Sequence, residues 1–208
     1  MSVARLHTVL KARKDQGKCG KCGTPLPAGS AYRHFSVGFR SSYVQKRCMK
    51  VECTPRPSER ESSKLSAVYS AMEGAEDELA ALRSQDPGTQ DDVTSIITTV
   101  AESIREVADE YREADEMIGG GGSGATISGE RADELEEAAS SLEYFSPTAD
   151  PEEADVCGEH AGEDHELEPG ETIEEIREAC DNCRELRAAV WDELITEAET
   201  ELSNVAVG

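Results

Sequence analysis

The segment that decides the fold is "GKCGKCGTPLPAGSAYRHFSVGFRSSYVQKRCMKVEC", residues 17–53, which holds four of the seven cysteines of the chain. The four fall into two pairs, Cys19-x2-Cys22 and Cys48-x4-Cys53. Four thiolates form a closed tetrahedral ligand set of the kind that binds structural zinc and leaves no coordination position for a substrate. We therefore expect one structural Zn²⁺ held by these cysteines. The alternatives are a redox-active CxxC pair and thiols with no shared role.

The chain between the two pairs is expected to form a short β-hairpin. Phe35, Val37 and Phe39 alternate with other residues, as in a strand with one buried face. After a turn, residues 43–48 can return as the second strand. Two strands of this length need a cross-link to be stable, and a bound metal supplies one. His34 is an alternative ligand, although we expect it to be an ordinary strand residue.

Charge is divided unequally along the 208 residues. Residues 1–64 contain 14 Lys and Arg and 4 Asp and Glu, a net charge of +10, whereas residues 65–208 contain 7 and 40, a net charge of −33. Aromatic residues make up only 4% of the chain and charged residues 31%, which suits small modules and helices with narrow apolar stripes better than one large core. The split predicts a small basic head and a separate acidic body.

Two helices are expected after the head, at about 59–84 and 91–118. Ser58 can cap the first, with Glu61 three residues later. The apolar residues of both alternate at spacings of three and four, a heptad pattern. They are Leu65, Val68, Met72, Ala75, Leu79 and Leu82 in the first, and Val93, Ile97, Val100, Ile104, Val107, Tyr111, Ala114 and Ile118 in the second. A short turn joins the helices, so we expect an antiparallel coiled-coil hairpin.

The remainder is expected to be acidic and helical. "GGGGSG", residues 119–124, is typical of a flexible tether. Helices are predicted at about 128–144 and 171–203, separated by a Pro/Gly-rich acidic loop. Trp191, the lone tryptophan, should pack against a neighbouring helix. The predicted fold is thus mainly α with a zinc-ribbon-like β module, divided into a head (1–57), a hairpin (58–118), a tether (119–127) and an acidic helical region (128–208) with a loop at about 146–170.

Basic and aromatic residues gather in the head. Cations beside aromatic faces suit a phosphate backbone with stacked bases, so the head is a candidate for contact with nucleic acid. The residues that we expect to make this contact are Lys11, Arg13, Lys14, Lys18, Lys21, Arg33, Arg40, Tyr43, Lys46 and Arg47. The alternatives are that the charges only solvate a small domain, or that they dock it on the acidic part of the same chain.

A second set of cysteines and histidines has metal-ligand spacing. Cys157-x2-His160 and Cys180-x2-Cys183 could together bind a second zinc ion. The competing interpretation is that Cys180 and Cys183 are small buried residues in the apolar stripe of the last helix. A catalytic metal in this cluster is a third hypothesis, but it would need an open coordination position and a pocket, and the sequence offers no apolar pocket.

Catalytic motifs are absent from the sequence. There is no P-loop, GxSxG or HExxH motif, and we expect a protein that is not an enzyme. No run of 18 apolar residues suggests a transmembrane helix, and the N-terminus lacks the features of a signal peptide. A cytoplasmic protein is expected, with no membrane partner.

Several stretches together resemble an uncharacterised family of tailed-bacteriophage and prophage proteins, with a small basic head and an acidic helical hairpin. They include "LKARKD", "CGKCGTPLPAGSAYRHFSVGFRS", "YVQKRC", "AESIREVADEYREADEMI" and "CDNCRELRAAVWDEL". The resemblance covers nearly the whole chain. It implies a viral origin and expression in the host cytoplasm, and it implies no established activity.

The leading hypothesis is a non-enzymatic phage accessory protein. Its zinc-stabilised head contacts nucleic acid or a nucleoprotein, and its acidic helices bind a protein partner or a second copy of the chain. The alternative is an acidic inhibitor or DNA-mimic decoy that occupies a basic groove on a host nucleic-acid or defence enzyme.

Overall fold

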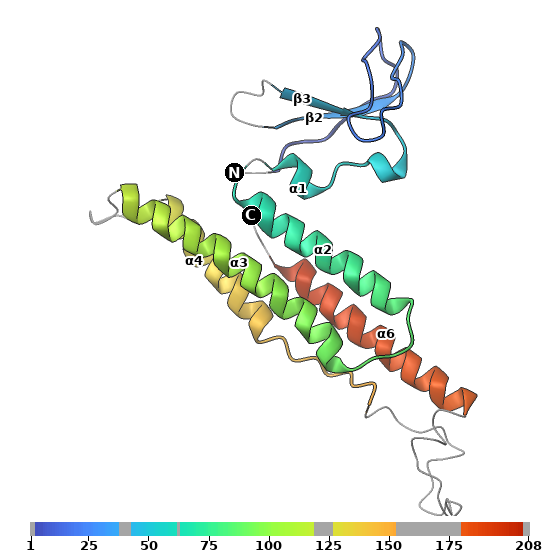
Figure 1. The fold of residues 1–208 in the computed structure, drawn as a ribbon, viewed down its shortest axis with the longest axis vertical. Helices are drawn as coiled ribbons and strands as arrows, with labels where there is room; N and C mark the ends of the chain where they lie inside the picture. The colour runs from blue at the N-terminus through green and yellow to red at the C-terminus, as the bar shows by residue number, and fades with distance from the viewer. Residues whose placement is uncertain (1–2, 38–42, 62, 119–126, 153–179, 206–208) are drawn as a thin grey trace, which may run out of the picture. The chain divides into compact units, whose positions relative to one another are not determined.

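The computed structural model describes residues 3–37, 43–61, 63–118, 127–152 and 180–205. These residues form a mainly helical protein with a three-stranded antiparallel sheet near the N-terminus (Figure 1). The predicted fold class, mainly α with a small zinc-ribbon-like module, is confirmed. The contacts divide the chain into two compact units, which we call the basic unit (up to Glu73) and the acidic unit (from Gly74).

The sheet of the basic unit has the strand order β1-β2-β3. The strands are β1 (His7–Val9), β2 (Tyr32–Val37) and β3 (Tyr43–Arg47). The predicted hairpin corresponds to β2 and β3, in which Phe35 lies opposite Gln45. Strand β1 was not predicted, because its three residues are too few for an alternating pattern to stand out.

Strand β2 is covered on both faces, unlike the one-sided strand that the sequence predicted. Tyr32 and Phe35 are both buried, at 9% and 1% exposure, although residues three apart in a strand point to opposite faces. Tyr32 belongs to a hydrophobic cluster with three of the cysteines, namely Cys19, Cys48 and Cys53. The cysteines are therefore part of the core of the basic unit.

A short helix, α1 (Pro57–Arg60), follows the sheet, and the single helix predicted at about 59–84 is instead two helices, α1 and a second that begins at Leu65. Proline at the first helical position has the backbone angle that a helix needs, so the helix begins at Pro57 and Ser58 is not its cap. The Arg56 backbone N–H donates to Glu59 Oε2 at 3.0 Å. The Ser58 hydroxyl instead donates to Glu73 Oε2 at 2.6 Å.

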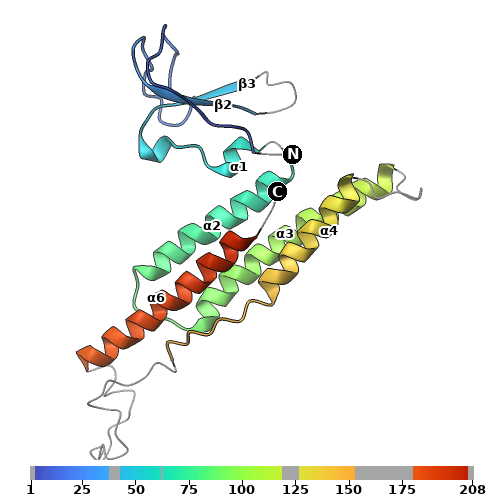
Figure 2. The ribbon, with the colours of Figure 1, turned by 180° about the vertical axis from the view of Figure 1, so that it is seen from behind.

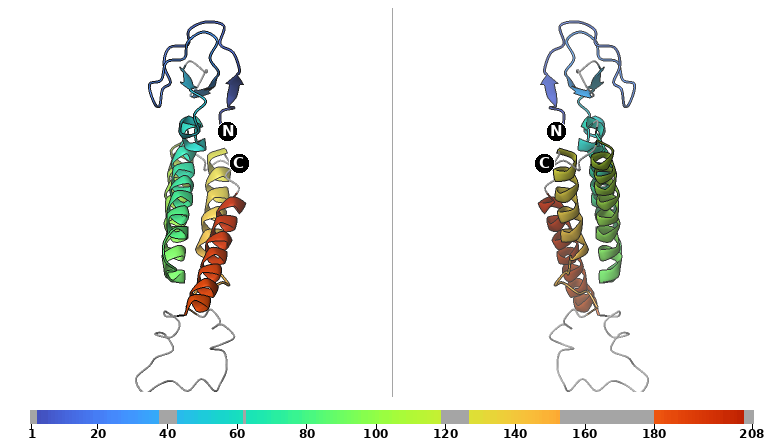
Figure 3. Two further views of the ribbon diagram at one scale, coloured as in Figure 1. Left: turned by 90° about the vertical axis from the view of Figure 1, so that its right-hand side faces the viewer. Right: turned by 90° about the vertical axis from the view of Figure 1, so that its left-hand side faces the viewer.

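The long helices are α2 (Leu65–Arg83), α3 (Gln90–Ile118), α4 (Ile127–Glu143) and α6 (Asp181–Asn204). The predictions of helices at 91–118 and 128–144 are confirmed to within one residue. In the acidic unit, successive helices run in alternating directions (Figure 2). Figure 3 shows α3 on one side with α2, and α4 and α6 on the other. No described helix has the length and hydrophobicity that crossing a bilayer requires.

Helices α3 and α4 form the closest helix pair of the acidic unit. Both bury alanines seven residues apart, Ala101 and Ala108 in α3 and Ala132 and Ala139 in α4, each at 1% exposure or less. Small side chains let two helix axes approach closely. These alanines widen the apolar stripe of α3 beyond the heptad positions that the sequence analysis used.

Helix α6 is tied to the C-terminal end of α2. Trp191 is buried, and its Nε1 donates to the Leu82 carbonyl oxygen at 3.3 Å, so the expected packing of the lone tryptophan is confirmed. Beside it, Arg83 pairs with Asp192 at 2.7 Å and with Glu199 at 2.9 Å.

Some predictions fall outside the described residues. They are the tether at 119–126, most of the acidic loop, the first part of the last helix (171–179), Phe39 and Arg40.

Candidate metal centre and basic surface

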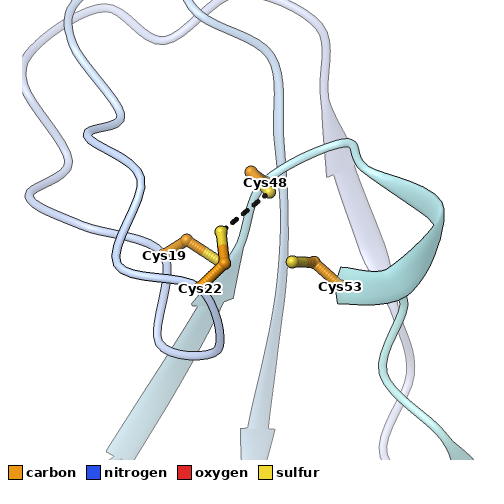
Figure 4. Close-up of side chains that lie close together, drawn as sticks. All are labelled: Cys19, Cys22, Cys48 and Cys53. Atoms are coloured by element: carbon orange, nitrogen blue, oxygen red, sulfur yellow. Dashed lines mark hydrogen bonds between the residues drawn. The ribbon is translucent and has the colours of Figure 1, made fainter.

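The first cysteine pair lies in a tight turn before β2. The Cys19 backbone N–H donates to the Thr24 carbonyl oxygen at 2.8 Å, and the Gly23 N–H donates to the Cys19 carbonyl oxygen at 3.0 Å. Gly23 has a φ of 73°, in the left-handed region that glycine adopts without strain. This turn directs the side chains of Cys19 and Cys22 towards the same point (Figure 4).

The second pair comes from the end of β3. Cys48 directly follows the strand, and Cys53 ends a single 3-10 turn, η1 (Val51–Cys53). The Cys53 N–H donates to the Lys50 carbonyl oxygen at 3.1 Å and closes this turn. The four-residue gap between the cysteines, which is longer than in the first pair, is taken up by this extra turn.

The four sulfur atoms converge. All lie within 4.8 Å of one another, and the sulfurs of Cys22 and Cys48 are 3.6 Å apart (Figure 4). A tetrahedral zinc ion bound at about 2.3 Å would set its sulfurs roughly 3.8 Å apart. None of the described cysteines is in a disulfide. The two pairs, distant in sequence, therefore lie close enough to hold one metal ion, as the sequence predicted.

The electrostatics of the cluster also fit a cation. Burial acts to raise the pKa of Cys19, but hydrogen bonds from the backbone N–H groups of Cys22, Cys48 and Lys21 outweigh it and lower the pKa to about 6. Burial raises the pKa of Cys53 to about 12, together with hydrogen bonding to the other three thiols and the charge of Cys19. The cluster thus favours the thiolate at Cys19 and opposes it at Cys53, a conflict that a divalent cation at the centre would relieve.

Cys22 is the exposed member of the cluster. Its sulfur lies 3.0 Å from the Thr24 hydroxyl, and this hydrogen bond is the main cause of a lowered pKa for Cys22. The other three cysteines are buried. A metal in this site would therefore have one edge near solvent.

His34 is not part of the cluster. It lies in the middle of β2, opposite Lys46 in β3, and its ring stacks on that of His7 at a centroid distance of 5.2 Å. The expectation that His34 is an ordinary strand residue agrees with this position. His7 was not singled out from the sequence, because nothing in its local pattern places it beside His34.

The second predicted metal site is described only in part. Cys157 and His160 lie outside the described residues. Cys180 is the half-buried residue that immediately precedes α6, and Cys183 is buried in its first turn. The competing interpretation, two cysteines in one helical stripe, thus fits Cys183 but not Cys180, whose backbone is extended.

Five predicted nucleic-acid contacts are exposed in the segment that leads into and forms the first cysteine turn: Lys11, Arg13, Lys14, Lys18 and Lys21. We call these five residues the basic loop. Tyr43, at the start of β3, is 64% exposed. Tyr32 and Phe35 are buried, so they are not accessible for base stacking.

Three other predicted contacts make hydrogen bonds within the basic unit. Arg33 Nη1 donates to the Thr54 hydroxyl at 2.9 Å, and Lys46 Nζ donates to the Gln16 carbonyl oxygen at 3.2 Å. The third, Arg47, is buried, with only 6% of its surface exposed.

Arg47 links the sheet to α1. Its Nη2 lies 3.1 Å from Glu59 Oε1, its Nη1 donates to Gln45 Oε1 at 2.9 Å, and its guanidinium carbon lies 5.6 Å from the centroid of the Phe35 ring. Burial acts to raise the pKa of Glu59, but the Arg56 N–H and the Arg47 guanidinium lower it overall. Arg47 therefore stabilises the fold and is not part of the exposed basic surface.

The fold and the cluster together define a protein with acidic helices and a small β module whose four cysteines lie close enough to hold a metal ion. Comparisons with known proteins identify no relative: no family model, curated protein or solved structure matches the chain. The resemblance to a tailed-phage family stays a prediction.

Proposed function

We propose that this protein is a non-enzymatic accessory protein whose zinc-stabilised basic unit binds the phosphate backbone of nucleic acid. Its acidic helices bind a protein partner. The observation that supports this most directly is the position of the basic loop. Its five cations are exposed, and Lys18 and Lys21 directly precede Cys19 and Cys22 in the chain, so a metal held by the cluster would fix the turn that carries them.

Zinc is the metal that best suits the ligand set. Four cysteines supply soft sulfur ligands in a closed tetrahedral site, which is typical of structural zinc. When bound, the ion would cross-link the first cysteine turn to the end of β3. A basic unit with so small a hydrophobic core needs such a cross-link.

The arginines of the acidic unit support the assignment of nucleic-acid binding to the basic unit. Five of them pair with carboxylates of the same unit, which leaves little positive charge for a phosphate backbone. They are Arg83, Arg105, Arg112, Arg131 and Arg184.

The test compares two triple variants of the full chain that remove equal charge. The first carries Lys14→Gln, Lys18→Gln and Lys21→Gln in the basic loop. The matched control carries Arg5→Gln, Lys50→Gln and Lys64→Gln, also exposed in the basic unit. Affinity for a short oligothymidylate is measured by fluorescence anisotropy as a function of salt.

Removal of each lysine that contacts a phosphate of a single strand should reduce the magnitude of the slope of log K against log salt by about 0.7. We expect the basic-loop variant to lose up to about two units of slope, and the control variant to resemble the wild type. Equal losses in both variants would mean that only net charge matters, and no binding by the wild type would contradict the proposal.

The acidic decoy is the second candidate, because one face of α3 carries a row of exposed carboxylates. Glu102, Glu106, Asp109, Glu113 and Glu116 follow one another at spacings of four and three. Such residues lie about 5 Å apart along a helix axis. If the decoy is correct, Glu102→Gln, Glu106→Gln and Glu113→Gln together should abolish capture of a protein with a basic groove, and the basic-loop variant should not.

A further inference from the structure

Two histidines and a lysine form a row across the three strands of the sheet. His7 in β1 lies opposite His34 in β2, which in turn lies opposite Lys46 in β3. Residues directly opposite each other in antiparallel strands project from the same face. We call these three residues the imidazole row.

The two rings of the row are stacked. Their centroids are 5.2 Å apart, with an interplanar angle of 14°. Tyr32, on the same face two residues before His34, has its ring centroid 5.9 Å from that of His34. His7 is exposed, whereas His34 and Lys46 are half-buried. A ligand can therefore reach the row from solvent over β1.

Within the described part of the chain, no carboxylate forms an ion pair with the row. The pKa of His34 is lowered by burial and by the charges of His7 and Lys46. Among the described residues, no carboxylate contributes to this shift. The Lys46 ammonium donates a hydrogen bond to the Gln16 carbonyl oxygen, which is neutral. When protonated, the three side chains thus place three cations next to one another on one face.

We propose that the imidazole row binds a phosphate group of the nucleic-acid backbone and takes up a proton as it does so. The inference rests on the proposed function, since it gives the basic unit a second phosphate contact besides the basic loop. A phosphate suits the row better than a metal ion, because the Lys46 ammonium has donors and no acceptor and repels a cation.

Proton uptake follows from linkage between binding and protonation. A phosphate near the rings stabilises the imidazolium form, so the pKa of His34 rises when the phosphate binds. Because the pKa of His34 in the free protein is lowered, affinity should increase as pH falls below the ordinary histidine pKa of about 6.5. An opposite charge within hydrogen-bonding range shifts a pKa by about one unit or more, which corresponds to about a tenfold gain in affinity.

The direct test is NMR titration of the histidine rings in the full, zinc-loaded chain. The chain has four histidines, and the variants His7→Gln and His34→Gln assign the two signals of interest. The protein is titrated with acid in three conditions: without ligand, with a short oligothymidylate, and with inorganic phosphate. We expect the pKa of His34 to rise with the oligonucleotide, while the signals of His160 and His165 serve as internal references.

Affinity measured from about pH 7.5 to about pH 5.5, on either side of the histidine pKa, gives a second readout. The wild type should gain about tenfold more affinity than the His7→Gln, His34→Gln double variant over this range. Unchanged metal content and unchanged amide spectra would show that the double variant is folded.

The outcomes separate this inference from the proposed function. Equal pH dependence in wild type and double variant, or a His34 pKa that the oligonucleotide does not move, would overturn the role of the row and leave the basic loop untouched. If only inorganic phosphate raises the His34 pKa, the row binds a free anion and not the nucleic-acid backbone, which also overturns this inference and leaves the basic loop untouched.

Discussion

The Gly20 backbone N–H donates a 2.8 Å hydrogen bond to the Lys46 carbonyl oxygen, and this bond joins the first cysteine turn to the end of β3. The approach is so close that a Cβ atom on Gly20 would lie 2.5 Å from Arg47 Nη1 and 3.4 Å from the Lys46 carbonyl oxygen. The first cysteine turn and the end of β3 thus contact each other at Gly20, where a larger side chain would collide with Arg47.

Gly20→Ala should therefore destabilise the basic unit. The new methyl group must displace Arg47, which Glu59 and Gln45 hold in place. Overpacking of this kind costs about 1–3 kcal/mol. Urea unfolding followed by the amide signals of β2 and β3 measures the loss.

Gly74→Ala is the control for this substitution. Gly74 lies inside α2, and a Cβ there would meet nothing within 4 Å. Alanine in a helix interior is favoured over glycine by about 1 kcal/mol, so this variant should be no less stable than the wild type. If Gly20→Ala were as stable as Gly74→Ala, the close contact between Gly20 and Arg47 would be wrong.

The ion pair between Arg47 and Glu59 should lower the pKa measured when Glu59 is titrated. Because the pKa of Glu59 is lowered in the folded state, its carboxylate stabilises the fold above the unfolded value of 4.5, and this contribution is lost as pH falls through the folded pKa. We expect the carboxyl carbon signal of Glu59 to titrate below 4.5 in the wild type.

Arg47→Gln removes the charge that holds this carboxylate. The Glu59 midpoint should move upwards, and the basic unit should lose about 1.5–3 kcal/mol, the usual contribution of a hydrogen bond to a charged group. A midpoint that is the same in both proteins would exclude the Arg47 interaction as a cause of the lowered pKa.

Trp191 should anchor α6 to α2. Its side chain is 3% exposed, so Trp191→Ala removes a large buried surface and should cost about 3–5 kcal/mol. Trp191→Phe keeps most of the packing, loses the hydrogen bond to Leu82 and should cost about 1 kcal/mol. Thermal unfolding followed by circular dichroism at a helix wavelength ranks the variants, and equal melting temperatures for all three would contradict the contact.

The sequence predicted those parts of the basic unit that have a recognisable pattern of neighbouring residues. The spacing of Cys19, Cys22, Cys48 and Cys53 predicted that they share one site, because thiolate pairs in turns have few other uses in a small module. The alternation around Phe35 located β2. Strand β1 and its His7 were missed, because three residues with no apolar pattern pair with β2 only through the tertiary fold.

In the acidic unit, the sequence likewise predicted the helices but not how they pack on one another. The spacing of Val93, Ile97 and Val100 predicted the buried stripe of α3, because helix periodicity is local. The same pattern could not reveal that α4 packs most closely on α3, since that choice depends on alanines such as Ala101 and Ala139 meeting in space. Arg47 was assigned to the surface because a sequence does not show which cation finds a carboxylate partner.

The two compact units should respond separately to removal of metal. A strong chelator should collapse the amide signals of β2 and β3, because the cluster is part of their core. The fluorescence of Trp191, which reports on the acidic unit, should keep its buried emission maximum. A shift of that emission to the wavelength of an exposed tryptophan upon chelation would contradict the division into units.

The central claim is that four cysteines hold one ion that supports the basic unit. Metal analysis of the freshly purified full chain tests it most directly, with the Cys19→Ser, Cys48→Ser variant beside it and Cys180→Ser, Cys183→Ser as the control. We predict that zinc is bound by the wild type, that the first variant loses about one equivalent together with the dispersed signals of β2 and β3, and that the control keeps this site. A wild type without bound metal, whose basic unit stays folded when Cys19 and Cys48 are serine, would contradict the account.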